Sequence, residues 1–245
     1  MNGLHNYGNN CFINSIVQIF RYYPPIIRKL VDVYPQDPVA KELVNVLFQD
    51  NDYKKFIETL SDTNIDPYRQ GDAHEFCLKM IDHLTEYLQL GKTVSVLTCA
   101  CGHTMTNVET LTCLTIHGDV AAGILSYIAP EPVNAKCEKC SHTSLVKTMV
   151  IEPSDMLVVQ TNRFMLGDKL MYNVDLGPIV CGGRKWKVFA VCNHYGTYNG
   201  GHYTACTNTP NGWTMFNDEM VHKLDNLPTN SDLPYMMFYV PYGEE

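Results

Sequence analysis

The chain has 245 residues, of which 45% are hydrophobic and 18% are charged, and its formal net charge is -8 at pH 7. This length and apolar content allow a complete hydrophobic core, arranged as one large domain or two small ones. An acidic chain without a block of lysine and arginine argues against a nucleic-acid-binding protein.

The N-terminus has no basic segment followed by an apolar one, so we expect no signal peptide. No apolar run reaches the roughly 18 residues of a membrane helix. Ten cysteines are many for an intracellular chain, and only two pairs are closely spaced, Cys99 with Cys101 and Cys137 with Cys140. Such pairs indicate a metal site rather than a disulfide framework. We therefore expect a soluble intracellular protein with no membrane partner.

The first ninety residues are predicted to be mostly helical. After a polar loop, apolar residues recur at three- and four-residue steps from Phe12 to Phe20. This spacing predicts a helix that ends before Pro24, because proline cannot continue a helix. Further helices are predicted at 43–48, 56–60 and 72–84, the last of them with Asp72 as its N-cap.

Cys11 would lie in the first turn of the first helix. Unpaired backbone N–H groups and the helix dipole favour an anion there, and a thiolate is an anion. Cys11 is therefore a candidate nucleophile. The alternative is a buried structural thiol, since free cysteine is among the most buried residue types.

From about residue 94 the sequence changes to strand character. Segments rich in β-branched and aromatic residues predict strands at 94–98, 111–116, 145–151, 156–161, 185–191 and 236–240. Two further strands, 203–206 and 213–216, are separated by turn residues. Helices first and strands later predict an α+β fold rather than alternating βαβ units.

A polar, glycine-rich stretch near the C-terminus contains two histidines, His194 and His202. If the strands around it form a hairpin that folds at residues 209–210, His202 lies opposite Asn217, with Asp218 next to it; a bulge would shift this register by one. A histidine oriented by Asn or Asp, together with a cysteine at a helix start, is what thiol catalysis requires. We favour His202 as the base, because His194 has no partner in this register.

These stretches together resemble the ubiquitin-specific protease family of deubiquitinating enzymes. Its cysteine box, an internal block and its histidine box correspond to residues 3–18, 70–76 and 201–218. The matching residues are Gly3, Leu4, Asn6, Gly8, Asn9, Cys11, Asn14, Ser15, Gln18, Gln70, Asp72, Ala73, Glu75, Phe76, Gly201, His202, Tyr203, Trp213, Phe216, Asn217 and Asp218. The chain departs from the pattern at Asn10, Phe12 and Gly71, where the family has Thr, Tyr and Gln.

The resemblance implies the papain-like cysteine protease fold, with a thumb, a palm and fingers that hold ubiquitin. It implies a single catalytic domain over residues 1–245, with the thumb at about 1–92, the fingers at 93–155 and the palm at 156–245. The interval between the two cysteine pairs is short for the family. We therefore expect shortened fingers.

The resemblance also implies catalytic roles. Cys11 would be the nucleophile that forms an acyl-enzyme thioester, and His202 the base that deprotonates it. Asn217 would orient the imidazole, and Asp218 could share this task. Asn6 would donate a hydrogen bond to the oxyanion. The alternative for Asn6 is a turn residue bonded to its own backbone.

Five residues are expected to bind the substrate: Gln70, Asp72, Gly200, Gly201 and Tyr203. Gly200 and Gly201 have no side chains, so a substrate backbone could come close, although a flexible loop is the alternative. Asp72 resembles a family position that contacts basic residues in the ubiquitin tail. Capping its own helix is an equal alternative.

In the fingers, the family often has two Cys-x-x-Cys pairs that bind a structural zinc ion. This chain has one such pair, Cys137 and Cys140, and a shorter pair, Cys99 and Cys101. Two histidines near these pairs could replace one ligand: His103 and His142. We expect zinc here, and a decayed site with free thiols is the alternative.

We therefore predict a monomeric thiol-dependent deubiquitinase that hydrolyses isopeptide or peptide bonds at the C-terminal glycine of ubiquitin, without a cofactor in catalysis. A different ubiquitin-like modifier is a narrower alternative. We expect it in the cytoplasm or the nucleus, of a host cell if the chain is viral. A catalytically idle ubiquitin-binding module is the alternative class, but here every catalytic position is filled.

Overall fold

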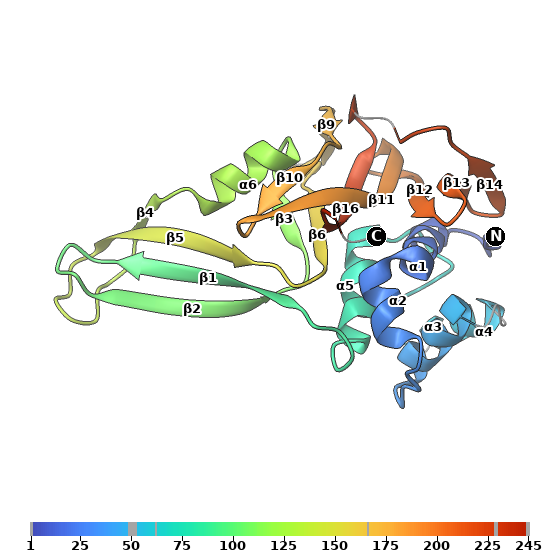
Figure 1. Ribbon diagram of the computed structural model, residues 1–245, viewed down its shortest axis with the longest axis horizontal. Helices are drawn as coiled ribbons and strands as arrows, with labels where there is room; N and C mark the ends of the chain where they lie inside the picture. Colours follow the sequence, from blue (N-terminus) through green and yellow to red (C-terminus); the bar gives the residue numbers. More distant parts are fainter. Residues whose placement is uncertain (1, 49–52, 62, 166, 228–229, 244–245) are drawn as a thin grey trace.

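The computed structural model describes residues 2–48, 53–61, 63–165, 167–227 and 230–243. Figure 1 shows three parts: a group of helices from the N-terminal third, a large sheet beside them, and a long, narrow sheet that projects away from both. No helix of the described chain has the length and apolar character needed to span a bilayer.

Five helices form the N-terminal part: α1 (Cys11–Tyr22), α2 (Pro24–Leu30), α3 (Pro38–Phe48), α4 (Tyr53–Ser61) and α5 (Ala73–His83). The predicted helix start at Cys11 and its end before Pro24 are confirmed. The sequence did not predict α2, which begins at Pro24. Proline is tolerated there because the first turn of a helix leaves its N–H groups unpaired in any case.

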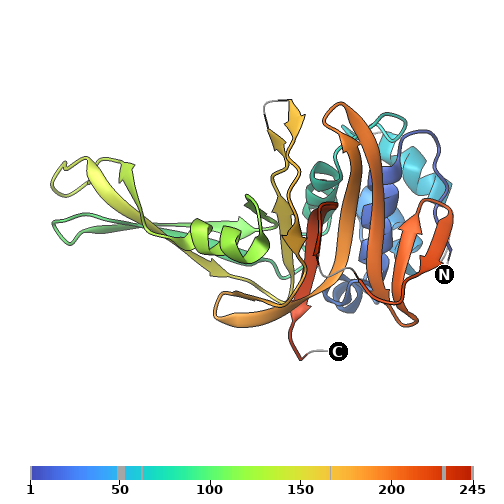
Figure 2. The same ribbon diagram turned by 90° about the horizontal axis from the view of Figure 1, so that it is seen from above.

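The large sheet lies against the N-terminal helices (Figure 2). Its strands are β3 (Leu114–Ile116), β6 (Leu157–Thr161), β10 (Ile179–Cys181), β11 (Arg184–Thr197), β12 (Gly200–Thr209), β13 (Gly212–Asn217), β14 (Met220–Lys223) and β16 (Pro234–Pro241). They run in the order β14-β13-β12-β11-β16-β6-β3, and β10 pairs with β11. Every residue of β16 is buried. The centre of the sheet therefore belongs to the core.

Helix α1 packs against one face of this sheet (Figure 2). Aromatic rings join the two layers: Tyr22 stacks on Phe216, and Phe20 and Tyr23 both meet Phe238 edge-on. Every residue of α1 from Cys11 to Phe20 is buried. Burial of one large apolar side chain contributes about 1.5–3 kcal/mol to folding, so the position of α1 on the sheet is strongly specified.

The projecting sheet has four strands: β1 (Gly91–Thr98), β2 (Thr104–Leu111), β4 (Glu131–Asn134) and β5 (Ser144–Glu152), in the order β2-β1-β5-β4. Helix α6 (Val120–Ile128) lies beside β5 (Figure 1). Four short strands complete the structure: β7 (Phe164–Met165), β8 (Asp168–Lys169), β9 (Val174–Asp175) and β15 (Asn230–Ser231).

One expectation for this region was wrong, and two elements were missed. The predicted strand 111–116 is divided, because Leu111 ends β2 in the projecting sheet whereas Leu114 begins β3 in the large sheet. Most of β2 and all of α6 were not predicted. β2 is an exposed edge strand with few apolar residues, so it lacks the alternation that marks a half-buried strand.

The predicted hairpin register was also wrong, by two residues. The turn is at Pro210–Asn211, and Thr209 pairs with Gly212, so Asn217 does not lie directly opposite His202. Proline at the second position and a left-handed glycine (φ 92°) at the fourth suit a type I turn here. Because side chains alternate with a period of two, a two-residue shift keeps His202 and Asn217 on the same face.

Candidate active site

The two predicted catalytic stretches meet where α1 packs on β12. Cys11 is the first residue of α1, and it is buried. Asn10 stands at the N-cap position, but its side chain does not bond the first-turn N–H groups. The helix therefore presents the thiol at an end whose side-chain cap is open, where a negative charge is favoured.

His202 of β12 interacts with the Cys11 side chain on one side, as its raised pKa indicates, and hydrogen bonds with Asn217 on the other. Its Nε2 lies 2.6 Å from the Asn217 Oδ1. An amide oxygen only accepts, so Nε2 carries a proton and Nδ1 is the nitrogen left for the thiol. The pKa of His202 is raised to about 9, chiefly by the hydrogen bond with Cys11 and against the opposing effect of burial.

Asp218 follows Asn217 in a turn where its backbone is left-handed, with φ 50°. Its Oδ2 is 4.0 Å from the His202 Nε2, so Asn217 is the direct partner of the ring and Asp218 acts on it through charge. The carboxylate accepts hydrogen bonds from the Nδ2 atoms of Asn6 (2.8 Å) and Asn14 (2.6 Å). It therefore joins the base to the loop before Cys11.

The N-terminal loop is attached to this turn through its backbone. The Leu4 N–H donates to the Asp218 carbonyl at 2.9 Å. A side chain at Gly3 would have its Cβ only 2.3 Å from the Glu219 carbonyl oxygen. This close approach explains why glycine is needed at position 3.

Asn6 has the turn contacts that the sequence offered as an alternative to the oxyanion role. Its Oδ1 accepts from the backbone N–H groups of Gly8 (3.0 Å) and Asn10 (3.3 Å). Its Nδ2 donates one hydrogen to Asp218. Because a side-chain amide has two such hydrogens, the second is the one that could serve an oxyanion. The turn contacts hold the amide in place and do not exclude that role.

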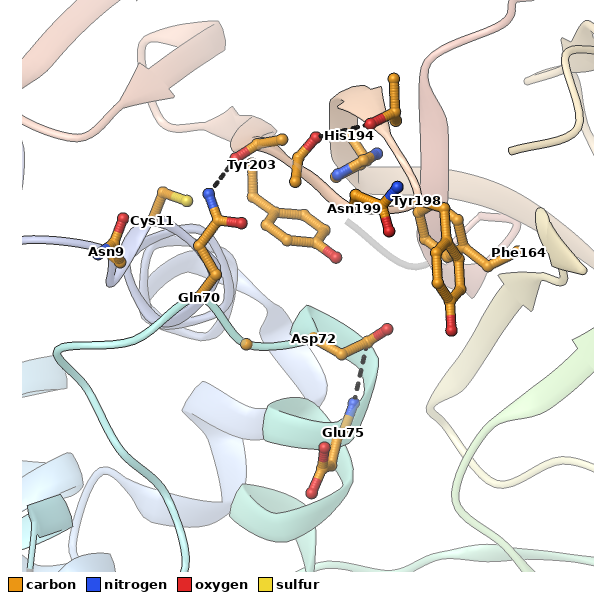
Figure 3. Close-up of a pocket in the computed structure, with 14 residues that line it drawn as sticks. Asn9, Cys11, Gln70, Asp72, Glu75, Phe164, His194, Tyr198, Asn199 and Tyr203 are labelled. Atoms are coloured by element: carbon orange, nitrogen blue, oxygen red, sulfur yellow. Dashed lines mark hydrogen bonds between the residues drawn. The ribbon is translucent and has the colours of Figure 1, made fainter. Parts of the chain in front are cut away.

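A groove of about 460 Å³ runs past Cys11 between the helices and the sheet (Figure 3). All five residues predicted to bind substrate line it: Gln70, Asp72, Gly200, Gly201 and Tyr203. Gln70 bridges the two walls, because its Nε2 donates to the Gly201 carbonyl at 3.4 Å. Residues of both layers of the fold thus line the groove beside Cys11.

The protein's own backbone requires a glycine at position 201, and a neighbouring side chain leaves little room at position 200. A Cβ at Gly201 would lie 2.1 Å from the Tyr195 carbonyl oxygen and 2.3 Å from the His194 Nε2. At Gly200 it would lie 3.0 Å from the Gln70 Oε1. Both glycines belong to β12 rather than to an irregular loop. Their small size lets β11, β12 and the Gln70 loop approach closely.

Asp72 caps α5, as one of the two alternatives predicted. Its Oδ1 accepts from the backbone N–H groups of His74 (2.6 Å) and Glu75 (3.2 Å). Its Oδ2 accepts from the Tyr235 hydroxyl at 2.7 Å. The carboxylate also lines the groove, so the cap does not remove it from a substrate's reach.

His194 lies in an apolar pocket rather than beside Cys11. Its ring contacts Phe164, Tyr203 and Tyr235, and it is only 3% exposed. Burial lowers its pKa to about 4, so it is neutral at physiological pH. His194, Phe164 and Tyr198 all line the groove but were not predicted to bind substrate. Nothing in their sequence spacing marks them, because β7 and β11 meet only in the folded chain.

The four predicted metal ligands come together at the tip of the projecting sheet. Their sulfur atoms all lie within 4.8 Å of one another; Cys99 and Cys140 are 3.6 Å apart, and Cys101 and Cys137 are 3.8 Å apart. A tetrahedral zinc ion with Zn–S bonds near 2.3 Å requires sulfurs about 3.8 Å apart. The residues therefore fit zinc. Among the described residues, no histidine takes part in this cluster.

The family profile described as ubiquitin carboxyl-terminal hydrolase matches residues 2–239. The chain belongs to this family. Human ubiquitin carboxyl-terminal hydrolase 19 is 30% identical over 131 residues, which cover 42% of this chain and 10% of that protein. Bovine ubiquitin carboxyl-terminal hydrolase 21 is 27% identical over 119 residues, which cover 42% of this chain and 21% of that protein. The match thus spans about a fifth or less of these relatives.

Solved structures of the family have the same fold as this chain. A SAGA DUB module of Ubp8, Sgf11, Sus1 and Sgf73 bound to ubiquitin aldehyde matches with a TM-score of 0.85 and 20% sequence identity. A module of the same subunits bound to monoubiquitin gives the same values. Each match covers 100% of this chain and 70% of the other. The predicted α+β, papain-like thumb–palm–fingers fold is thereby confirmed.

Proposed function

We propose that this protein is a thiol-dependent deubiquitinase, which hydrolyses isopeptide or peptide bonds at the C-terminal glycine of ubiquitin. One observation carries the proposal. Where α1 packs on β12, Cys11 interacts with His202 strongly enough to raise its pKa, and His202 is held by Asn217 at 2.6 Å. A thiol, a base and an orienting amide in this order form the arrangement that nucleophilic thiol catalysis requires.

The reaction that this geometry supports is acyl transfer. His202 takes the proton of Cys11, and the thiolate attacks the carbonyl carbon of the terminal glycine. The imidazolium then gives its proton to the departing lysine amine, which leaves a thioester on Cys11. Water, deprotonated by His202, releases free ubiquitin and the thiol. We propose that Asn6 donates to the oxyanion of both tetrahedral intermediates; the bond from its Nδ2 to Asp218, which leaves a second hydrogen, supports this role.

The groove beside Cys11 supports an extended substrate. The hydrogen bond between Gln70 and Gly201 joins the two walls of the groove beside Cys11. Because this bridge leaves little room, the groove suits a terminal segment with small residues. Asp72 and Glu75 give one wall two carboxylates, which would attract basic residues of a peptide tail. We propose that Gln70, Asp72, Gly200, Gly201 and Tyr203 bind the tail of ubiquitin or of a related modifier.

We also propose that Cys99, Cys101, Cys137 and Cys140 hold a structural zinc ion. The sulfur separations given above support this proposal, and four thiolates would close the coordination sphere. Such an ion would stabilise the projecting sheet and take no part in the chemistry at Cys11.

The remaining proposals concern where and how the protein works. A nucleophilic thiol and a four-thiol cluster both need reduced cysteines, which the cytoplasm and the nucleus maintain. We therefore propose an intracellular location. The catalytic groups all come from one chain, which supports a monomeric enzyme. Sgf11, Sus1 and Sgf73 accompany Ubp8 in the structures similar to this one, so partner subunits are the competing possibility.

The test is hydrolysis of a ubiquitin–lysine isopeptide conjugate under reducing conditions. The wild type should release free ubiquitin, and Cys11→Ala should release none. A second conjugate with a different ubiquitin-like modifier identifies the substrate. If the wild type and Cys11→Ala are both inactive on each conjugate while ubiquitin still binds, the chain is an idle binding module and the proposal is wrong.

A further inference from the structure

A buried polar network lies behind Asp218, on the side away from the base. Asp218 uses both carboxylate oxygens, one for Asn6 and one for Asn14. Its side chain is only 16% exposed. The orientation of the Asp218 carboxylate therefore determines where the Asn6 amide is held. It also keeps an oxygen of this carboxylate 4.0 Å from the His202 ring.

Asn14 has one permitted orientation in this network. An ionised carboxylate only accepts hydrogen bonds, so Asn14 must present its Nδ2 to Asp218. The same Nδ2 reaches the Leu4 carbonyl at 3.3 Å. The Oδ1 of Asn14 then faces the other way and needs donors, because Asn14 is only 2% exposed and an unpaired oxygen would be costly there.

Two donors meet that oxygen. The Tyr53 hydroxyl donates to the Asn14 Oδ1, and the Asn10 Nδ2 lies 3.0 Å from the same atom. Asn10 also bonds the Tyr53 oxygen at 3.1 Å, while its own Oδ1 accepts from the Tyr7 N–H at 2.7 Å. Asn10 is a position where the chain departs from the pattern of its family, which has Thr there. A threonine has no amide with which to bridge Asn14 and Tyr53.

Tyr53 comes from α4, which contributes no other residue to the site as described above. Its ring packs against Tyr7 and Phe56 at centroid distances of 6.2 and 6.3 Å. Burial raises its pKa far above the usual range. The hydroxyl therefore keeps its proton at any physiological pH and remains a donor.

We infer that Tyr53 is a positioning residue for catalysis: its hydroxyl fixes the amide of Asn14, and Asn14 thereby holds Asp218 against Asn6 and beside His202. This inference rests on the proposed function. It gives helix α4 a role in the chemistry although none of its residues lines the groove. It also gives Asn10 a use that the family motif does not suggest.

The test compares Tyr53→Phe with Tyr23→Phe in the full chain. Each variant removes one buried hydroxyl and keeps its ring. Tyr23 is a matched control, because its hydroxyl donates to the Tyr239 carbonyl at 2.6 Å and lies outside the network. Loss of one such bond corresponds to about a five- to tenfold change in rate if it acts only in catalysis. We expect Tyr53→Phe to lower kcat on a ubiquitin–lysine conjugate by about this factor with KM unchanged, and Tyr23→Phe to change neither.

A double-mutant cycle separates positioning from a general structural effect. In an Asp218→Asn background, which keeps a residue that tolerates the left-handed backbone, Tyr53→Phe should lower kcat no further. Equal kcat values for Tyr53→Phe and Tyr23→Phe would overturn the inference, and so would a full additional loss in the Asp218→Asn background.

The pKa of His202 can be measured without enzyme turnover, so it tests the positioning inference separately from the proposed function. Asp218 is one of the groups that raise the pKa of His202, so Tyr53→Phe should lower that pKa in an NMR titration, whereas Tyr23→Phe should leave it unchanged. A wild type without activity would contradict the deubiquitinase proposal only. In that event an unchanged His202 pKa in Tyr53→Phe would overturn the positioning inference, and a lowered one would support it.

Discussion

The catalytic seam between α1 and β12 and the tip of the projecting sheet depend on different interactions. The seam is surrounded by one large core that includes helices α1 to α5 and strands β11, β12 and β16. At the tip the buried cluster consists of Cys99, Cys137 and Leu145, with a few partly buried neighbours. A core of this size contributes little by burial. We conclude that packing positions Cys11 and His202, whereas we expect the tip, which has little core, to depend on its thiol cluster.

This difference predicts that damage to one region should leave the other intact. Substitutions at the seam should change the rate of the chemistry without melting the projecting sheet. Loss of the thiol cluster should loosen the tip without changing the geometry at Cys11.

Replacement of the base should have the largest effect. His202→Ala removes the group that we propose takes the proton of Cys11, so kcat/KM on a ubiquitin–lysine conjugate should fall by about a thousandfold or more. The matched control is His222→Ala, an exposed histidine on β14, which should keep wild-type activity. Comparable activity in the two variants would mean that His202 is not the base.

Removal of the predicted oxyanion donor should cause the second largest loss of activity. Asn6→Ala should lower kcat by about a hundredfold, with a small change in KM, because one oxyanion donor typically contributes roughly 3 kcal/mol. Steady-state kinetics give both constants. Asn107→Ala, an exposed asparagine on β2 of the projecting sheet, is the control and should behave as the wild type. A rise in KM with kcat unchanged would assign Asn6 to substrate binding alone.

Loss of the thiol cluster should act on the tip. Cys137→Ser should abolish binding of one zinc ion per chain, and hydrogen exchange should accelerate in β1, β2 and β5 but not in α1. We expect KM for ubiquitin conjugates to rise severalfold while kcat is kept. Cys113→Ser, outside the cluster, is the control. Zinc content that survives Cys137→Ser would show that the cluster is not the site.

The smallest expected effect is on pH dependence. The pKa of His202 is raised to about 9 in the folded protein, above its ordinary value of 6.5. The imidazolium is therefore present at neutral pH, and activity should fall as pH rises through about 9, where the proton donor for the leaving amine is lost. Any contribution of His202 to the stability of the fold is complete below pH 6.5 and is lost as pH rises through about 9.

The variant Cys11→Ala isolates the cause of this shift. The hydrogen bond with Cys11 is the largest contribution that raises the pKa of His202, so its removal should move the pKa back toward the ordinary range. NMR titration of the imidazole measures this directly. A His202 pKa that stays near 9 in Cys11→Ala would place the cause elsewhere.

Helix and strand periodicity in the sequence predicted the parts of the site that lie on regular elements. The steps of apolar residues after Cys11 located the helix start, and the two strands before and after the turn brought His202 to Asn217. The prediction that His202 meets Asn217 was correct although the predicted hairpin register was wrong by two residues. A shift of two preserves the face of a strand, whereas a shift of one would have turned Asn217 away.

Other features depend on contacts that have no local pattern. Phe164 and Tyr198 enter the groove because β7 and the end of β11 lie near β12 in space. The bond from Tyr53 to Asn14 connects two helices through polar atoms, and such bonds leave no periodic signal in the chain. The strand β2 was not recognised because an exposed edge strand lacks apolar alternation.

The most direct test of the central claim is the site of covalent labelling by ubiquitin that carries an electrophile at its C-terminus. The chain has ten cysteines, so the position of the adduct is informative. Intact mass and peptide mapping under reducing conditions should show one ubiquitin per chain, attached to Cys11, and Cys11→Ala should show none. An unlabelled wild type, or an adduct at another cysteine that persists in Cys11→Ala, would contradict the account.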